Sequence, residues 1–290
     1  MRTLVFGKSG QVARALADLV ENDTHFLFLG HGETDLSEPD AGGDAVAEYS
    51  PDVVINAAAY TAVDKAESKK GLAHNINAQA VERIAAACKN TGAQFIHIST
   101  DYVFDGNETG RYSETSITNP ANAYGQSKLA GEEAAIAAYA ETIVVRTSWI
   151  FSEYGSNFVK TMLRLARERN ELSIVSDQIG GPTDARDIAK ALLAIVGKKH
   201  RGGPGAGVYH FQGAPAVSWA DFARKIFEIN GNNTAVTAIP TSQYPTPARR
   251  PLNTVLDCAK IERDFGIGQP DWRASLRRVI DALKQKEERT

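Results

Sequence analysis

Two residues with a helical spacing have side chains suited to proton transfer. Tyr124 and Lys128 stand four positions apart at the start of a predicted helix, so they share one helix face. A free phenol has a pKa of about 10, and only ~0.1% of it is ionised at neutral pH. An ammonium group about 4 Å away, at an effective dielectric constant of about 20, would stabilise the phenolate by roughly 4 kcal/mol. This energy equals about three pKa units, so the pair is predicted to be a general acid and its activator.

A third candidate for the same chemistry follows a predicted strand. Ser99-Thr100-Asp101 ends an apolar run, and the Thr100 hydroxyl can hydrogen-bond either the phenol or a substrate oxygen. A Tyr-x-x-x-Lys pair alone is common on amphipathic helices that carry no chemistry. Its combination with a strand-end Ser-Thr and a glycine turn favours the catalytic interpretation.

The glycine turn is Gly7-x-x-Gly10-x-x-Ala13, between a predicted strand over 3–6 and a predicted helix. The first glycine allows a tight turn, the second lets the backbone approach a pyrophosphate, and Ala13 lets the helix pack on the strand. The helix N-terminus offers free N–H groups to phosphates. The alternative is a simple turn that needs glycine for a positive φ. Residues 30–35 have no acid directly at the strand end and no arginine, so the predicted cofactor is NADPH or NADH.

The elements that must position these residues alternate between strands and helices. Such alternation predicts βαβ units, and hence an α/β fold with a Rossmann-like, doubly wound parallel sheet. The predicted first domain, 1–150, binds the dinucleotide, and 151–290 forms a smaller α+β substrate-binding lobe that can return a strand and a helix to the first domain. Strands are predicted over 3–6, 25–29, 53–56, 94–99, 142–147 and 208–211, and helices over 78–89, 126–139, 154–169, 222–229 and 274–288.

Composition excludes several classes of protein. The chain has 290 residues, 43% hydrophobic and 23% charged, which excludes disordered and fibrous proteins. A net charge of −3 gives no reason to expect a nucleic acid or an anionic membrane as partner. The two cysteines and six histidines lack metal-ligand spacing, so no metal site is predicted and His97 is expected to be structural. No apolar run reaches ~20 residues and the N-terminus turns polar early, so a cytoplasmic location is expected.

The chain resembles the extended short-chain dehydrogenase/reductase family. The resemblance covers nearly the whole sequence and rests first on the glycine turn, Asn56-Ala-Ala-Ala59, Ser99-Thr100-Asp101-Tyr-Val-Phe-Asp-Gly106 and Tyr124-x-x-x-Lys128. Later motifs are similar to one branch, which reduces the C4 ketone of dTDP-4-dehydro-6-deoxy-L-mannose to dTDP-L-rhamnose for lipopolysaccharide or cell-wall polysaccharide. These are Arg146-Thr-Ser-Trp149, Asn157-Phe158, Asp177-Gln-x-Gly-x-Pro-Thr183 and Tyr244-Pro-Thr-Pro-Ala-Arg249-Arg250-Pro251.

The resemblance implies a role for each matching residue. Tyr124 would donate the proton, Lys128 would lower its pKa and bind the nicotinamide ribose, and Thr100 would tune the tyrosine. Tyr60 stands where the family more often has histidine. The implied cofactor-binding residues are Gly7, Gly10, Gln11, Val12, Asp35, Leu36, Ala59, Tyr60, Thr61, Ile98, Tyr124 and Lys128.

The implied substrate is a dTDP-sugar, bound by Thr100, Asp101, Trp149, Asn157, Arg249 and Arg250. The Trp149 ring suits a methyl-bearing deoxysugar, although it could equally be interdomain core. The two arginines suit a diphosphate, or one of them could bridge the lobes to an acid such as Asp257.

Other activities of the same fold stay open. The chain could be another nucleotide-sugar reductase, a 4-epimerase that retains its NAD, or a non-catalytic regulatory subunit. A 4,6-dehydratase is disfavoured because it needs a second carboxylate, and Asp101 is followed by Tyr102. The expected assembly is a monomer or a homodimer.

Overall fold

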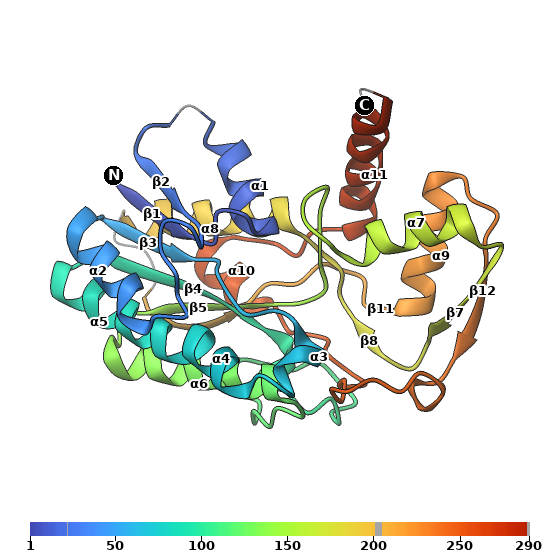
Figure 1. Cartoon of the computed structure of the whole chain (residues 1–290), viewed down its shortest axis with the longest axis horizontal. Helices are drawn as coiled ribbons and strands as arrows, with labels where there is room; N and C mark the ends of the chain where they lie inside the picture. The colour runs from blue at the N-terminus through green and yellow to red at the C-terminus, as the bar shows by residue number, and fades with distance from the viewer. Residues whose placement is uncertain (22, 201–204, 289–290) are drawn as a thin grey trace.

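A six-stranded parallel sheet forms the centre of the computed structural model, which describes residues 1–21, 23–200 and 205–288 (Figure 1). This confirms the predicted α/β fold. The order in which the chain adds strands to the sheet changes direction between β1 and β3. Ligands of such sheets bind at the carboxyl ends of the strands near this point. The order is β10 (Gly207–His210), β5 (Ile143–Thr147), β4 (Gln94–Thr100), β3 (Val53–Asn56), β1 (Thr3–Phe6) and β2 (Phe26–Leu29).

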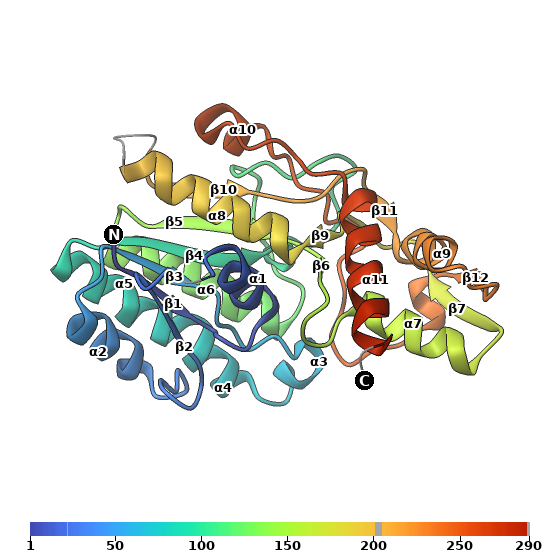
Figure 2. The same cartoon turned by 90° about the horizontal axis from the view of Figure 1, so that it is seen from above.

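Helices cover both faces of the sheet (Figure 2). Side chains of β1 alternate between them: Val5 joins one core cluster, and Leu4 and Phe6 join the other. The first face carries α1 (Gln11–Leu19), α8 (Ala185–His200) and α10 (Ala259–Phe265). The second carries α2 (Pro39–Tyr49), α5 (Ala80–Thr91) and α6 (Ala123–Ala138), with α3 (Val63–Ala66) and α4 (Lys70–His74) beside α6.

The second half of the chain builds a smaller lobe and also contributes β10, α8 and α10 to the first one. Phe151, Phe222, Trp272 and Leu276 are buried at the centre of the smaller lobe. Residues 201–204, within the Gly/Pro-rich stretch noted in the sequence, lie outside the described residues. The lobe contains β6 (Ile150–Phe151), α7 (Phe158–Glu168), β7 (Glu171–Val175), β8 (Ile179–Gly180), β9 (Thr183–Asp184), β11 (Val217–Ser218), α9 (Trp219–Asn230), β12 (Ala235–Ile239) and α11 (Trp272–Glu288).

Local hydrogen bonds correct two predicted helix starts. The helix predicted from residue 126 begins at Ala123, because the Asn122 side chain accepts a 2.8 Å hydrogen bond from Gly125 N as its N-cap. The helix predicted from residue 78 begins at Ala80, after a π-helical turn, η1 (Asn75–Gln79). Two short 3₁₀ turns, η2 (Asp101–Val103) and η3 (Thr241–Gln243), complete the elements.

Among the described residues, no helix is both long enough and apolar enough to span a membrane.

Candidate active site

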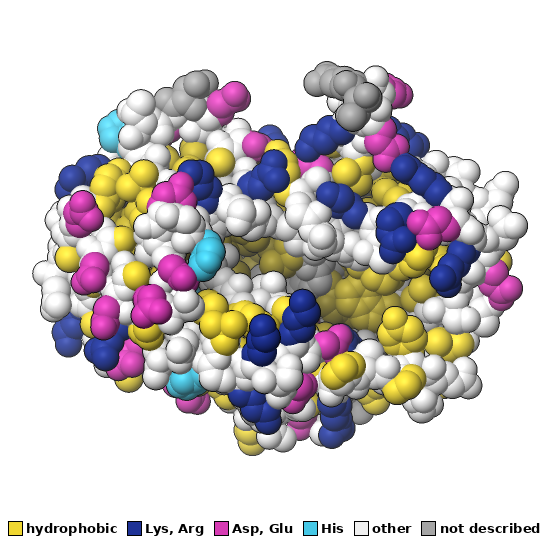
Figure 3. Space-filling model, in the orientation of Figure 1, with side chains coloured by type: hydrophobic (Ala, Val, Ile, Leu, Met, Phe, Trp, Pro, Cys, Tyr) yellow, Lys and Arg dark blue, Asp and Glu magenta, His cyan; other side chains and the backbone are white. Residues whose placement is uncertain are grey.

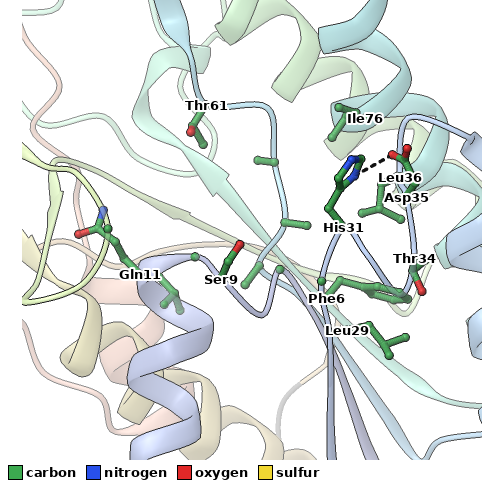
Figure 4. Close-up of a pocket in the computed structure, with 18 of the residues that line it drawn as sticks. Phe6, Ser9, Gln11, Leu29, His31, Thr34, Asp35, Leu36, Thr61 and Ile76 are labelled. Atoms are coloured by element: carbon green, nitrogen blue, oxygen red, sulfur yellow. Dashed lines mark ion pairs between the residues drawn. The ribbon is translucent and has the colours of Figure 1, made fainter.

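A cavity of about 830 Å³ opens at the carboxyl ends of β1, β2 and β3 (Figure 4). Its size is within the usual range for a ligand pocket, about 300–1,000 Å³. Many predicted cofactor residues line it, namely Gly7, Gly10, Gln11, Val12, Asp35, Leu36, Ala59 and Thr61. Tyr60, Ile98, Tyr124 and Lys128, also predicted for the cofactor, are not among its lining residues.

The glycine turn has the geometry of a phosphate cradle. Gly7 has φ +95°, and a Cβ there would lie 2.8 Å from the backbone of Ala57, so only glycine fits. The Gly10 amide donates to the Gly7 carbonyl at 2.7 Å, and Gly10 is the N-cap of α1. No acidic side chain stands in the first turn of α1, so its amides are available to an anion. The residues present therefore fit a dinucleotide.

The loop after β2 forms the opposite rim of the cavity. Glu33 accepts a 3.0 Å hydrogen bond from Gly30 N and pairs with Lys8 at 2.5 Å. Asp35 accepts from Ser37 N at 2.9 Å, which lowers the pKa of its carboxyl, and pairs with His31 at 3.1 Å (Figure 4). Both acids thus shape the loop, and Asp35 also faces the cavity.

Lys128 makes different contacts from those the sequence suggested. Its Nζ donates to the Ile98 carbonyl at 2.8 Å and lies 3.1 Å from His97 Nε2, with the residue only 1% exposed. Burial lowers the lysine pKa to about 8, against an opposing effect of Glu132. The pKa of Tyr124 is raised to about 12 by burial, although a hydrogen bond with Thr100 opposes the rise. The spacing predicts that both groups share one helix face, but burial of the phenol outweighs the expected activation.

Thr100 and Asp101 lie against the phenol at the end of β4. Thr100 Oγ1 donates to Asp101 Oδ1 at 3.0 Å and accepts from Tyr102 N at 3.2 Å. Asp101 is 2% exposed, and burial raises its pKa to about 7. The Tyr102 ring meets the Tyr124 ring edge-on, 5.8 Å between centroids. A phenol, a hydroxyl and a carboxyl therefore lie together at the end of β4, which suits proton donation.

A buried ion pair supports the end of β4 from behind. Glu132, one turn beyond Lys128 on α6, pairs with Arg146 of β5 at 2.6 Å, and both side chains are at most 5% exposed. The carboxylate also accepts from Ser99 Oγ, next to Thr100. His210 Nδ1 lies 3.1 Å from the Tyr112 carbonyl, and its Nε2 is 3.4 Å from Arg146. This network was not predicted from the sequence, although Glu132 continues the helix face of Tyr124 and Lys128.

Asn77 of the π-helical turn joins the loop that follows β3, which contains Tyr60, to α6. Its side chain accepts from Tyr60 N at 2.8 Å and donates to Ser127 Oγ at 2.9 Å. A Cβ on Gly131 of α6 would lie 1.9 Å from the Asn77 carbonyl oxygen, so glycine alone permits this approach. The turn thereby fixes Tyr60 relative to the helix that carries Tyr124.

Trp149 lies where the two lobes meet. Its ring stacks on Trp219 with 3.5 Å between centroids and a 5° interplanar angle, and its own φ is +45°. A Cβ on Gly180 would lie 2.6 Å from the Trp149 ring, so that glycine makes room for it. Figure 3 shows the molecule hollowed between its two halves, with hydrophobic side chains in the hollow.

The remaining predicted substrate residues differ in their contacts. Asn157 is the N-cap of α7, and its amide donates to Gln11 Oε1 at 2.9 Å across the lobe boundary. Arg250 forms a bidentate pair with Asp64 of α3, at 2.9 and 2.8 Å, instead of bridging to Asp257. The carboxylate of Asp257 accepts from a backbone amide in its own loop. Arg249 is exposed.

Replacing Asp64 with Asn should lower the free energy of unfolding by about 1 kcal/mol or less, because the pair with Arg250 is partly exposed. The pKa of Asp64 is lowered from 3.8 by the Arg250 hydrogen bond. The stabilisation is therefore present above 3.8 and is lost as pH falls through the lower, folded-state value. Urea unfolding at neutral and acidic pH tests this, and a deficit in Asp64→Asn that persists in acid would contradict it.

Comparisons with known proteins agree with this geometry. A family model described as RmlD substrate binding domain matches residues 1–285. The chain is similar to the dTDP-4-dehydrorhamnose reductase of Aggregatibacter actinomycetemcomitans, 44% identical over 287 residues, which cover 96% of this chain and 98% of the relative. The crystal structure of a dTDP-4-dehydrorhamnose reductase from Clostridium acetobutylicum has a TM-score of 0.93 and 36% identity, covering 98% and 100% of the two chains. That of the Bacillus anthracis enzyme in complex with NADP has a TM-score of 0.89 and 34% identity, covering 97% and 99%.

Proposed function

Since the chain belongs to the RmlD substrate binding domain family, we propose that it reduces dTDP-4-dehydro-L-rhamnose at C4 to dTDP-L-rhamnose, with Tyr124 as proton donor. It is an NAD(P)H-dependent oxidoreductase. The observation that carries the proton-donor assignment is the position of the Thr100 hydroxyl, which lowers the pKa of Tyr124 and also contacts Asp101 at the end of β4. The same sheet edge holds the dinucleotide-sized cavity.

In the proposed reaction the residues of this chain bind, orient and protonate. When bound, NADPH or NADH supplies the hydride that C4 receives. Tyr124 transfers its phenolic proton to the C4 oxygen. The Thr100 hydroxyl then turns its one proton from Asp101 to the phenolate that remains and stabilises it. This transfer suits a tyrosine with a raised pKa, because burial keeps the phenol protonated until the oxygen of C4 becomes basic.

Lys128, Ile98 and Tyr60 are proposed to border the nicotinamide end of the cofactor, although they do not line the cavity. Asp101, Trp149, Asn157, Arg249 and Arg250 are proposed for the sugar nucleotide. The raised pKa of Asp101, about 7, keeps part of its population protonated at neutral pH. The neutral form can donate a hydrogen bond to a sugar hydroxyl. A cytoplasmic location and a monomeric or homodimeric assembly complete the proposal.

In the deciding assay, the purified protein is mixed with dTDP-4-dehydro-L-rhamnose and NADPH. The absorbance of NADPH and the formation of the sugar product are then measured. We expect stoichiometric oxidation of NADPH and formation of dTDP-L-rhamnose. A 4-epimerase would convert the sugar without net oxidation, and a regulatory subunit would give neither change. Either outcome would overturn the proposal.

Replacing Trp149 with Ala should raise KM for the dTDP-sugar about tenfold, because loss of ring stacking costs roughly 1.5 kcal/mol. NADPH affinity should stay unchanged, since Trp149 does not line the cofactor cavity. Trp149→Phe is the matched control and should recover part of the loss. If KM stays constant while the unfolding midpoint falls, Trp149 is interdomain core only.

A further inference from the structure

A chain of hydrogen bonds leads from the cofactor cavity to Lys128 through two buried side chains. Ala58 lines the cavity, and its backbone N–H donates a hydrogen bond to Asn56 Oδ1 at 3.0 Å. The nitrogen of the same amide, Asn56 Nδ2, lies 3.2 Å from His97 Nδ1. His97 Nε2 in turn lies 3.1 Å from Lys128 Nζ. Asn56 and His97 are completely buried, so water cannot take the place of a missing partner.

The direction of each bond follows from the first one. A backbone N–H can only donate, so the Asn56 oxygen must face Ala58 and its NH₂ must face His97. His97 Nδ1 therefore accepts, and a neutral imidazole with an accepting Nδ1 carries its proton on Nε2. That proton points at Lys128 Nζ. An ammonium group can only donate, whereas the neutral amine has a lone pair that accepts this bond.

We propose that His97 is a positioning residue of the active site: fixed by Asn56, it donates from Nε2 to Lys128 and favours the neutral form of that side chain. This inference rests on the proposed function, in which Lys128 borders the nicotinamide end of the cofactor. Protonating Lys128 requires either a reversed Asn56 amide, which would turn its NH₂ toward the Ala58 N–H, or an unmade bond at His97. His97 thereby lowers the pH above which Lys128 stops being a cation.

The other charged groups around the pair are consistent with this role. Glu132 on α6 raises the pKa of Lys128, but its carboxylate is already paired with Arg146 of β5. Burial, which is the main cause, lowers the lysine pKa to about 8, and a donor from His97 to the neutral amine acts in the same direction. Burial and the nearby Lys128 lower the pKa of His97, so the imidazole stays neutral. From the sequence alone, His97 is expected to have only a structural role.

The tautomer of His97 gives a direct test that needs no activity. The wild-type protein is labelled with ¹⁵N-histidine, and long-range proton–nitrogen spectra are recorded in mildly alkaline buffer. We expect one imidazole with its proton on Nε2 whose signals disappear in His97→Gln. Asn56→Asp should move the proton to Nδ1, because its carboxylate accepts from both Ala58 and His97. A wild-type His97 with its proton on Nδ1 in alkaline buffer would overturn the proposal.

The pH dependence tests the consequence for Lys128. Asn56→Asp and His97→Gln each offer Lys128 an acceptor, so the alkaline limb of kcat/KM should move upward by roughly one pH unit. The alkaline limb of the pH dependence of NADPH affinity should move by the same amount. NADPH binding is measured without the dTDP-sugar, so this result does not depend on whether the proposed reaction occurs. Ile96→Val on the same strand is the matched control and should leave the limb in place. An unmoved limb in the folded His97→Gln protein would contradict the role of His97.

Discussion

Replacing Tyr124 with Phe should lower kcat about 100- to 10,000-fold, the usual contribution of a positioned general acid. The phenyl ring keeps the packing of Tyr124 against the buried cluster of Ala66, Ala73 and Ala123 and its edge-on contact with Tyr102, so the fold should be retained. Only the proton that the C4 oxygen needs is removed. Stopped-flow or steady-state oxidation of NADPH measures kcat, and fluorescence quenching measures NADPH affinity, which should change little.

The control for Tyr124→Phe is Tyr139→Phe, which removes a phenol at the other end of the same helix, after its last residue Ala138. Tyr139 packs against the core cluster on the face of the sheet that carries α2, α5 and α6, and it is not part of the site. Its variant should turn over at close to the wild-type rate. Wild-type rates in Tyr124→Phe, or a loss of NADPH binding as large as the loss of kcat, would contradict the assignment of Tyr124 as the acid.

Replacing Glu132 with Ala should lower the free energy of unfolding by about 3–5 kcal/mol, because the guanidinium of Arg146 would stay buried without its partner. A loss of this size is a large part of the ~5–15 kcal/mol that stabilises a typical protein. Ser99 would also lose its acceptor next to Thr100, so the folded fraction should have a lower kcat. Urea unfolding followed by circular dichroism measures the stability.

An exposed pair of the same chemistry provides the comparison for Glu132. Glu168 pairs with Arg164 one helical turn away, with side chains 53% and 62% exposed. Glu168→Ala should cost less than ~1 kcal/mol, because water and salt screen such pairs. Replacing both Glu132 and Arg146 with Met should recover much of the stability, since neither charge of this pair is then left buried without its partner. Equal losses in Glu132→Ala and Glu168→Ala would contradict the importance of burial.

Features that depend on neighbours in the sequence could be predicted. The strands of the sheet are short apolar runs, and the glycine turn needs only residues 7–13, so both were found and the parallel sheet is confirmed. Helix α2 was missed because its contact with α5 uses Gly42, where a Cβ would lie 2.8 Å from Ile84, and glycine gives no periodic apolar signal.

Features that depend on distant residues could not be predicted. The pairing of β7 with β12 joins residues more than sixty positions apart, and Arg250 meets Asp64 at a separation of 186 positions. Spacing placed Lys128 on the face of Tyr124, but the partner of its Nζ comes from β4, through His97 and Ile98. Burial, which reverses the expected shift of the tyrosine pKa, likewise depends on the complete fold.

The wide turn at Asn75–Gln79 limits how this enzyme can evolve. Each residue of an α-helix advances about 100° around the axis. Deleting one residue here would allow regular α-helical winding, and the residues that remain in the turn would move to new positions around the helix axis. Asn77 would then lose its place between Tyr60 and Ser127. We therefore expect insertions and deletions among descendants of this gene to be tolerated in surface loops. Within Asn75–Gln79 we expect them to be eliminated by selection.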